Sequence, residues 1–304
     1  MVLLLKLFKM LLDKDLEKVI VKEQIKTEIV KGIAPKLFNI IESLPNKTGV
    51  YYIHKENGTI IFIGKSRNIK KRVNQHFTGI TKSALKIQQE VFTVTYEETG
   101  SELIALLKES EEIKRNRPIY NRMSPKSHFP VAIYSETDAN GYLNLKLQKA
   151  DGRKKEIIAY TSLQDGKNTL FRISSQYSLC QKLTGLYETK AECFQHKINE
   201  CDGACIGKVL PEEYNKRVQD FIDANSFENQ SMIILDKGRT ISERSAILIE
   251  NGIYKGYAYY DLNYQISNIE ILKNIIIPMP NNRDTRNNIQ GYLRKNKVIK
   301  IVKF

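Results

Sequence analysis

Hydrophobic residues follow a helical period at the start of the chain and a strand period shortly afterwards. Leucine and isoleucine recur at helical spacing over residues 1–28, which predicts one or two helices with a single buried stripe. Another short helix is expected over Lys36–Ser43, after which Leu44, Pro45 and Asn46 interrupt the pattern. We therefore expect a domain boundary near residue 45.

The next segment predicts a β-hairpin. Two runs rich in β-branched and aromatic residues, Val50–His54 and Thr59–Ile63, flank a turn that contains Asn57-Gly58. This dipeptide between two such runs is a strong short-range signal for antiparallel pairing. Two antiparallel strands are therefore expected.

Helices and a third strand follow the hairpin. Asn68 is a suitable N-cap for a basic helix over Ile69–Phe77. Further helices are expected over Ser83–Glu90 and Ser101–Arg115, with a strand over Val91–Tyr96 between them. Together these elements predict a small antiparallel sheet flanked by helices.

The remainder of the chain has a mixed pattern. Residues 129–160 are strand-rich with a turn at Asn140-Gly141. The cysteine-containing segment and Pro211–Ala224 are helical, and residues 231–262 resemble a meander of strands. The predicted fold class is α+β, ending in a small, basic, β-rich domain. The predicted domains are residues 1–44, 45–125, 126–225 and 226–304.

Charge narrows the choice of partner. The formal net charge is +14 and the pI is near 9.4, so the surface attracts polyanions, of which DNA is the commonest candidate. The apolar opening Met1–Leu12 is interrupted by Lys6 and Lys9 and is too short to cross a bilayer. The sequence therefore favours a cytoplasmic protein that binds DNA, with no membrane association.

Residues suited to phosphodiester hydrolysis occur within residues 45–125. Hydrolysis needs a base for water and cationic groups for the developing phosphorane charge. Arg72 and His76 are four residues apart and share a helix face distinct from the apolar one. The helix expected over Ser101–Arg115 carries several acids that could bind Mg²⁺ or Mn²⁺: Glu102, Glu109, Glu111 and Glu112. Glu109 lies at the edge of an apolar stripe made of Leu103, Leu106, Ser110 and Ile113, which suits a cleft-facing carboxylate, but the helical pattern alone does not choose it over the other acids.

The combined pattern resembles a known family. Residues 49–51 read Gly-Val-Tyr and residues 62–64 read Phe-Ile-Gly, and the match continues through Glu109 to residues 117–121, Arg-Pro-Ile-Tyr-Asn. This arrangement resembles the GIY-YIG nuclease family, and within it the excinuclease subunit UvrC and its Cho-like relatives. The resemblance implies the following roles: Tyr51 as the general base, Arg72 and Lys65 on phosphate, His76 in orienting water, Glu109 on the metal, and Asn121 in support of the site.

One position departs from the family pattern. The tyrosine expected to open the second motif is Phe62, which cannot accept a proton. Either Tyr51 alone is the base, or Tyr52 or His76 compensates, or the domain has lost its activity and only binds DNA.

Four cysteines, at positions 180, 193, 201 and 205, are separated by 12, 7 and 3 residues. They are too few and too clustered for the disulfide framework of a small secreted domain, so a metal or cluster site is favoured. Their context resembles the cysteine region of UvrC, which implies a [4Fe-4S] cluster. Structural Zn²⁺ is the second choice and free thiols the third, with His196 a bystander. The ligand residues would be Cys180, Cys193, Cys201 and Cys205.

The expected function is metal-dependent cleavage of DNA, with nicking in nucleotide-excision-type repair. Residues 6–14 resemble the last helix of DnaQ-like proofreading exonuclease domains, whose acidic active site is absent here. The expected partners are therefore DNA and either other repair proteins or a separately encoded DnaQ-like exonuclease. A non-catalytic DNA-binding module or an accessory subunit is the alternative function.

Overall fold

The structure is a computed structural model. It describes residues 34–121, 129–226, 230–263, 269–296 and 298–304. Contacts divide the chain into two compact units, one comprising Met1–Glu98 and Asn116–Asn121, the other Thr99–Arg115 and Arg122–Phe304. The helices expected over residues 1–28 and the exonuclease-like segment lie outside the described residues.

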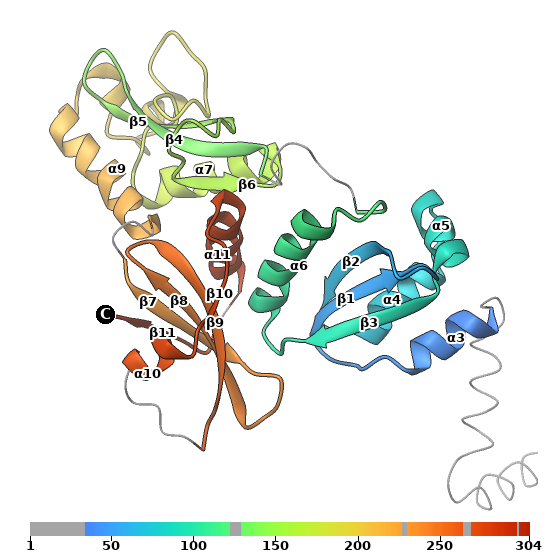
Figure 1. Ribbon diagram of the computed structural model, residues 1–304. Helices are drawn as coiled ribbons and strands as arrows, with labels where there is room; N and C mark the ends of the chain where they lie inside the picture. Colours follow the sequence, from blue (N-terminus) through green and yellow to red (C-terminus); the bar gives the residue numbers. More distant parts are fainter. Residues whose placement is uncertain (1–33, 122–128, 227–229, 264–268, 297) are drawn as a thin grey trace, which may run out of the picture. The chain divides into compact units, whose positions relative to one another are not determined.

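The first unit contains a three-stranded antiparallel sheet in the order β2-β1-β3 (Figure 1). The strands are β1 (Gly49–His54), β2 (Ile60–Ser66) and β3 (Thr93–Glu98). The predicted hairpin is confirmed: Gly58 has φ +80° and its N–H donates to the Lys55 carbonyl at 3.0 Å. Glycine adopts this left-handed conformation without a steric penalty, which is why the turn forms here.

Three helices share a hydrophobic core with this sheet. They are α3 (Pro35–Glu42), α4 (Ile69–Phe77) and α5 (Lys82–Glu90). The expected cap of α4 is confirmed, because the Asn68 side chain accepts a hydrogen bond from the Lys71 N–H at 2.9 Å. Ile69, Val73 and Phe77 are buried and join the same core as the strand residues, so α4 presents its polar side away from the core.

The helix α6 (Glu102–Asn116) matches the expected range within one residue at each end. Its contacts assign residues 99–115 to the second unit, although the sequence suggested one continuous module over residues 45–125. The expected stripe also differs from the observed one. The buried residues of α6 are Leu103, Ile104, Ala105 and Leu107, whereas Leu106, Ser110 and Ile113 are half-buried.

The middle of the chain forms a second small sheet with helices against it. Its strands, in the order β5-β4-β6, are β4 (Val131–Thr137), β5 (Leu143–Lys149) and β6 (Ile158–Tyr160). The helices are α7 (Leu163–Gln176), α8 (Phe194–Lys197), η1 (Ala204–Ile206) and α9 (Pro211–Asn225). The predicted turn at Asn140-Gly141 is confirmed by a φ of +83° at Gly141.

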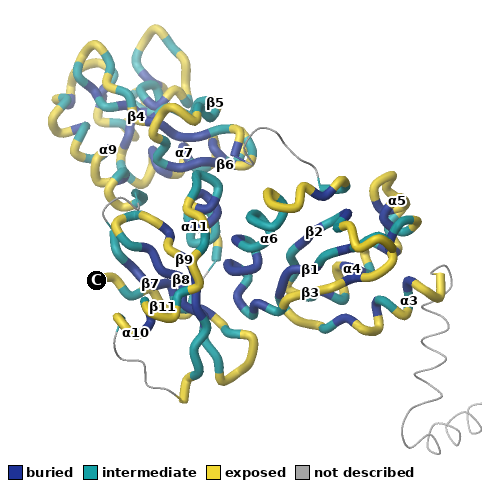
Figure 2. Tube along the Cα trace, viewed as in Figure 1, coloured by how far each residue is buried: buried dark blue, intermediate teal, exposed yellow. Residues whose placement is uncertain are grey.

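The C-terminal region is a five-stranded antiparallel sheet in the order β10-β9-β8-β7-β11. Its elements are β7 (Met232–Lys237), β8 (Glu243–Glu250), β9 (Ile253–Asp261), α10 (Ile269–Asn274), β10 (Ile277–Pro278), α11 (Arg283–Lys295) and β11 (Lys300–Lys303). The central strand β8 is buried without interruption from Ser245 to Ile249. Dark blue marks the buried stretches of this sheet in Figure 2. The predicted α+β class is confirmed. No helix in the described part of the chain is long and apolar enough to cross a membrane.

Candidate active site

Tyr51 lies in the middle of β1, where its side chain is almost completely buried at 1% exposure. Its phenolic oxygen is 2.8 Å from Nε2 of His76. Gly64 is the partner of Tyr51 on β2, and a Cβ at that position would overlap the phenolic oxygen. The glycine of the second motif therefore has a physical reason: it leaves room for the tyrosine of the first motif.

His76 connects this phenol to the helix α4. Its ring meets the edge of Phe62, with ring centroids 4.7 Å apart, and Phe62 in turn stacks on Tyr51 at 6.1 Å. Burial, and then the positive charge of Arg72, lower the pKa of His76 from 6.5 to about 4. His76 is therefore neutral near pH 7, and one of its ring nitrogens can accept a proton.

Arg72 lies one helical turn before His76 on the exposed side of α4. Its guanidinium donates to the Gln75 side chain at 3.0 Å. The expected shared face of Arg72 and His76 agrees with the effect of the arginine charge on the histidine pKa. Lys65 is half-buried near the end of β2, the strand that also carries Phe62. Positive charge is thus present on two elements of the first unit.

Asn121 completes the outer edge of β2. Its side-chain oxygen accepts the Ile63 N–H at 2.8 Å, and its side-chain nitrogen donates to the Ile63 carbonyl at 2.7 Å. The adjacent Tyr120 backbone N–H donates to the Ile61 carbonyl at 3.0 Å. Asn121 therefore supplies both hydrogen bonds that a neighbouring strand would make, which fixes the strand that bears Lys65.

Glu109 is half-buried on α6 and belongs to the second unit. Tyr51, Phe62 and His76 all belong to the first unit. Among the described residues, the one group of three or more side chains arranged to hold a metal ion is made of cysteines. The assignment of Glu109 as a metal ligand rests on the motif.

The cysteine group contains Cys180, Cys193 and Cys205, whose sulfur atoms all lie within 4.8 Å of one another. Cys201 lies outside this group but packs against the same hydrophobic core. Burial raises the pKa of Cys180, with a further contribution from the neighbouring cysteines. His196 forms a hydrogen bond through Nδ1 with the Cys201 carbonyl at 2.8 Å.

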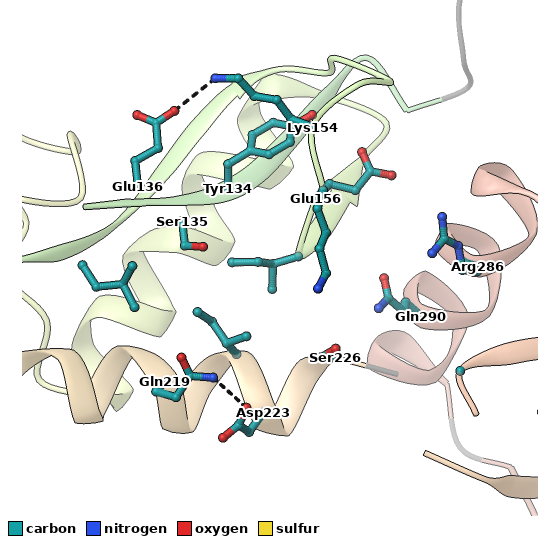
Figure 3. A pocket seen from close by; sticks show the side chains of 15 residues that line it. Tyr134, Ser135, Glu136, Lys154, Glu156, Gln219, Asp223, Ser226, Arg286 and Gln290 are labelled. Carbon is teal, nitrogen blue, oxygen red and sulfur yellow. Dashed lines mark hydrogen bonds and ion pairs between the residues drawn. The ribbon is translucent and has the colours of Figure 1, made fainter. Parts of the chain in front are cut away.

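A separate hollow of about 850 Å³ lies in the second unit between β4, β5, α9 and α11 (Figure 3). Its charged groups are largely paired, since Lys154 lies 3.3 Å from Glu136 and Gln219 donates to Asp223 at 2.8 Å. It contains none of the residues that the nuclease motifs single out. The hollow gives no support for a second hydrolytic centre.

Comparison with known proteins agrees with the motif pattern. Residues 47–122 match the family model of the UvrC-like GIY-YIG domain, and residues 132–224 match that of the UvrC/Cho excinuclease middle domain. UvrABC system protein C of Lachnospira eligens is 33% identical over 197 residues, which cover 61% of this chain and 32% of that protein. The Coxiella burnetii protein of the same name is 28% identical over 227 residues, which cover 72% of this chain and 36% of that protein.

A solved structure is also similar. The GIY-YIG N-terminal endonuclease domain of UvrC from Thermotoga maritima, bound to its catalytic magnesium, is 27% identical and covers 29% of this chain and 99% of that domain, with a TM-score of 0.28. The chain spans about a third of the length of the curated relatives that it matches. Neither matched range includes residues 225–304. The resemblance seen in the sequence is confirmed: residues 47–122 match the UvrC-like GIY-YIG domain, and residues 132–224 match the UvrC/Cho excinuclease middle domain.

Proposed function

We propose that this protein is a metal-dependent DNA endonuclease, which hydrolyses a phosphodiester bond and nicks DNA in nucleotide-excision-type repair. The observation that carries the proposal is the hydrogen bond between Tyr51 and a neutral His76, on the helix that also bears Arg72. A neutral ring that is held in place beside a cation suits proton transfer at a phosphate.

The motif suggests Tyr51 as the base, but we place the proton acceptor at the half-buried His76, because the Tyr51 phenol is almost completely buried. With Nε2–H donating to the Tyr51 oxygen, Nδ1 of His76 carries the free lone pair. As the water oxygen attacks phosphorus, its proton passes to Nδ1. The bond from phosphorus to the leaving oxygen breaks, and that oxygen takes a proton from solvent water. Tyr51 orients the ring, much as a buried carboxylate orients the histidine of a hydrolase triad. This arrangement supplies a base although Phe62 replaces the second motif tyrosine.

The phosphate is bound by Arg72 and Lys65. Arg72 has an exposed, permanently charged fork of donors, which suits a phosphodiester. Glu109 would hold Mg²⁺ or Mn²⁺, since a carboxylate oxygen is a ligand that these ions prefer. When bound, the ion supplies stabilisation of the negative charge that develops on the phosphoryl oxygens.

A [4Fe-4S] cluster is proposed at Cys180, Cys193, Cys201 and Cys205. Three of these sulfur atoms already lie within 4.8 Å of one another, and the fourth cysteine packs on the same core, so the donor set fits a thiolate-bound cluster. Four thiolates fit Zn²⁺ as well. Anaerobically purified protein should be brown and contain iron and sulfide, whereas colourless protein with stoichiometric zinc would replace the cluster by a zinc site.

A non-catalytic DNA-binding module is the second candidate, and Phe62 is the residue that favours it. The phenylalanine packs on His76 and offers no proton-accepting group. An accessory role beside a DnaQ-like exonuclease also stays a proposal, since it concerns residues outside the described part of the chain.

The deciding experiment is cleavage of nicked, damaged and branched DNA by the purified chain, with and without Mg²⁺ or Mn²⁺. We expect metal-dependent nicking. We also expect the logarithm of the DNA-binding constant to fall linearly with the logarithm of the salt concentration, with a slope of about −0.9 per phosphate contact. Binding without cleavage of any substrate would favour the non-catalytic module. Binding that does not change with salt would contradict a mainly electrostatic DNA interface.

A further inference from the structure

One side of α6 is buried by the C-terminal sheet. Leu103, Ile104 and Leu107 are at most 3% exposed and belong to a core to which the C-terminal region contributes the other buried members. Those members are Met232, Ile234, Ile247, Ile249, Tyr254, Tyr257 and Ile289. The helix that carries the candidate metal ligand is therefore packed on a domain that neither family match includes.

Glu109 projects from the other side of the same helix. At about 100° per residue, its position is roughly 120–160° around the axis from Leu103, Ile104 and Leu107. The side chains that pack on the C-terminal sheet therefore lie on the opposite side of the helix from Glu109. Any rotation or shift of the helix on the sheet would move the carboxylate by a comparable amount.

Polar contacts fix α6 along its whole length. At its start, the buried Ser101 hydroxyl donates to the buried Asp236 carboxylate at 2.7 Å. In the middle, Lys108 donates to the Tyr257 hydroxyl at 3.3 Å. Near its end, Lys114 forms an ion pair of 2.9 Å with Asp284 of α11. Three contacts at different heights restrict both rotation and sliding of the helix.

The chain that leads into α6 is equally constrained. Gly100 has φ +64°, and a Cβ there would overlap the carbonyl oxygen of Gly238 in the turn after β7. The Tyr259 hydroxyl donates to the neighbouring Thr99 carbonyl at 3.0 Å. The approach of two backbones without side chains between them sets the position of the helix N-terminus.

We propose that the domain formed by residues 226–304 positions the metal ligand Glu109 by holding α6, with Gly100, Ser101 and Asp236 as positioning residues. The inference rests on the proposed function, because it takes Glu109 to be the metal ligand. Groups that orient a metal ligand without touching the ion commonly alter metal affinity by 10- to 100-fold. The C-terminal domain is thus a working part of the nuclease and not an appended module.

The test is a Mg²⁺ titration of DNA cleavage by full-length variants. Asp236→Ala removes the acceptor of the Ser101 hydroxyl, and Gly100→Ala forces the two backbones apart. Both should raise the half-activating Mg²⁺ concentration about tenfold or more, while DNA affinity without metal stays unchanged. Asp236→Asn, which keeps an oxygen acceptor, should restore the wild-type value.

Gly141→Ala is the matched control for Gly100→Ala. Gly141 has a similar φ of +83° in the turn between β4 and β5, but the nearest atom to an added Cβ is 3.7 Å away. The control suffers the same backbone strain without displacing α6, so its Mg²⁺ dependence should match wild type. An equal shift in the control would attribute the effect to general strain and overturn the inference.

Two outcomes remain to be separated. If Glu109→Gln cleaves DNA like wild type, the proposed function fails at its metal ligand. If Glu109→Gln is inactive but folded Asp236→Ala and Gly100→Ala need no more Mg²⁺, only the positioning role fails. Should both variants unfold, Lys114→Met, which breaks the partly exposed ion pair to Asp284, decides in their place: an unchanged Mg²⁺ requirement would again overturn the inference.

Discussion

The two helices that carry the nuclease motif differ in what buries them. Helix α4, with Arg72 and His76, packs through Val73 on the sheet of its own unit. Helix α6, with Glu109, packs through Leu107 on the C-terminal sheet instead. A motif that is continuous in sequence is therefore supported by two separate cores, and the chemistry assigned to each helix depends on a different part of the chain.

The largest expected effect concerns the residue on α6. Glu109→Gln should lower the DNA cleavage rate by roughly 10³-fold, because it removes the ligand of the ion that stabilises transition-state charge. DNA affinity should change little, since the basic surface is intact. The measurement is single-turnover cleavage at saturating protein. Glu111→Gln, a nearby acid on the same helix, is the control and should behave like wild type.

Shortening one buried side chain on each helix tests whether α4 and α6 depend on different cores. Leu107→Ala should destabilise the protein by about 2–5 kcal/mol, because it deletes a buried side chain that the surroundings cannot fully replace. Loss of amide protection should concentrate in β7, β8 and β9, the strands that share a hydrophobic core with Leu107. Val73→Ala, on α4, should instead reduce protection in β1 and β2. If both variants weakened the same strands, the division into two cores would be wrong.

Local features of the fold could be predicted from the sequence because they depend on neighbouring residues. Asn68 caps α4, and Gly58 and Gly141 occupy turns with positive φ, as their positions suggested. The period of apolar residues also located α6 within one residue at each end. Such signals act over a few residues, so no tertiary information is needed to interpret them.

Long-range contacts were not predictable in this way. The bond between Ser101 and Asp236 joins residues 135 positions apart, and neither residue stands in a recognisable motif. The face of α6 was misjudged because the helix has apolar residues on more than one side, and periodicity alone does not say which sheet each side meets. The motif did select Tyr51 and His76, but their direct hydrogen bond required the structure.

His76 on α4 and Tyr51 on β1 should differ in how strongly their substitution slows cleavage. His76→Gln should slow cleavage by about 10²-fold, as loss of a general base commonly does. Tyr51→Phe should cost less, because it removes the group that orients the base and leaves the base itself. His54→Gln is the control, since His54 bonds to Thr95 and lies outside the cluster. A larger loss for Tyr51→Phe would return the role of base to the tyrosine.

The pH dependence follows from the same histidine. Its pKa in the folded protein is about 4, below the 6.5 of the unfolded chain, so protonation favours unfolding. The contribution of His76 to stability is complete above about pH 6.5 and decreases as the pH falls towards 4. For the same reason, the cleavage rate should not decrease as the pH is lowered through 6.5, where an ordinary histidine would become protonated. NMR titration of His76 should give the low value, and Arg72→Gln should raise it; a wild-type value near 6.5 would contradict the neutral acceptor.

The smallest expected effect is that of Phe62→Tyr. The substitution restores the phenol of the family motif beside His76, where the centroids of the Phe62 and His76 rings now lie 4.7 Å apart. If His76 is already the proton acceptor, a second acceptor adds little, and the cleavage rate should change by less than about threefold. Single-turnover rates of both proteins in Mg²⁺ and Mn²⁺ measure this. An inactive wild type rescued by Phe62→Tyr would show instead that His76 does not replace the missing phenol and that the substitution at this one position has disabled the helix α4 site. If neither protein cleaves and both bind DNA, the chemistry assigned to α4 is absent and the DNA-binding module is the correct function.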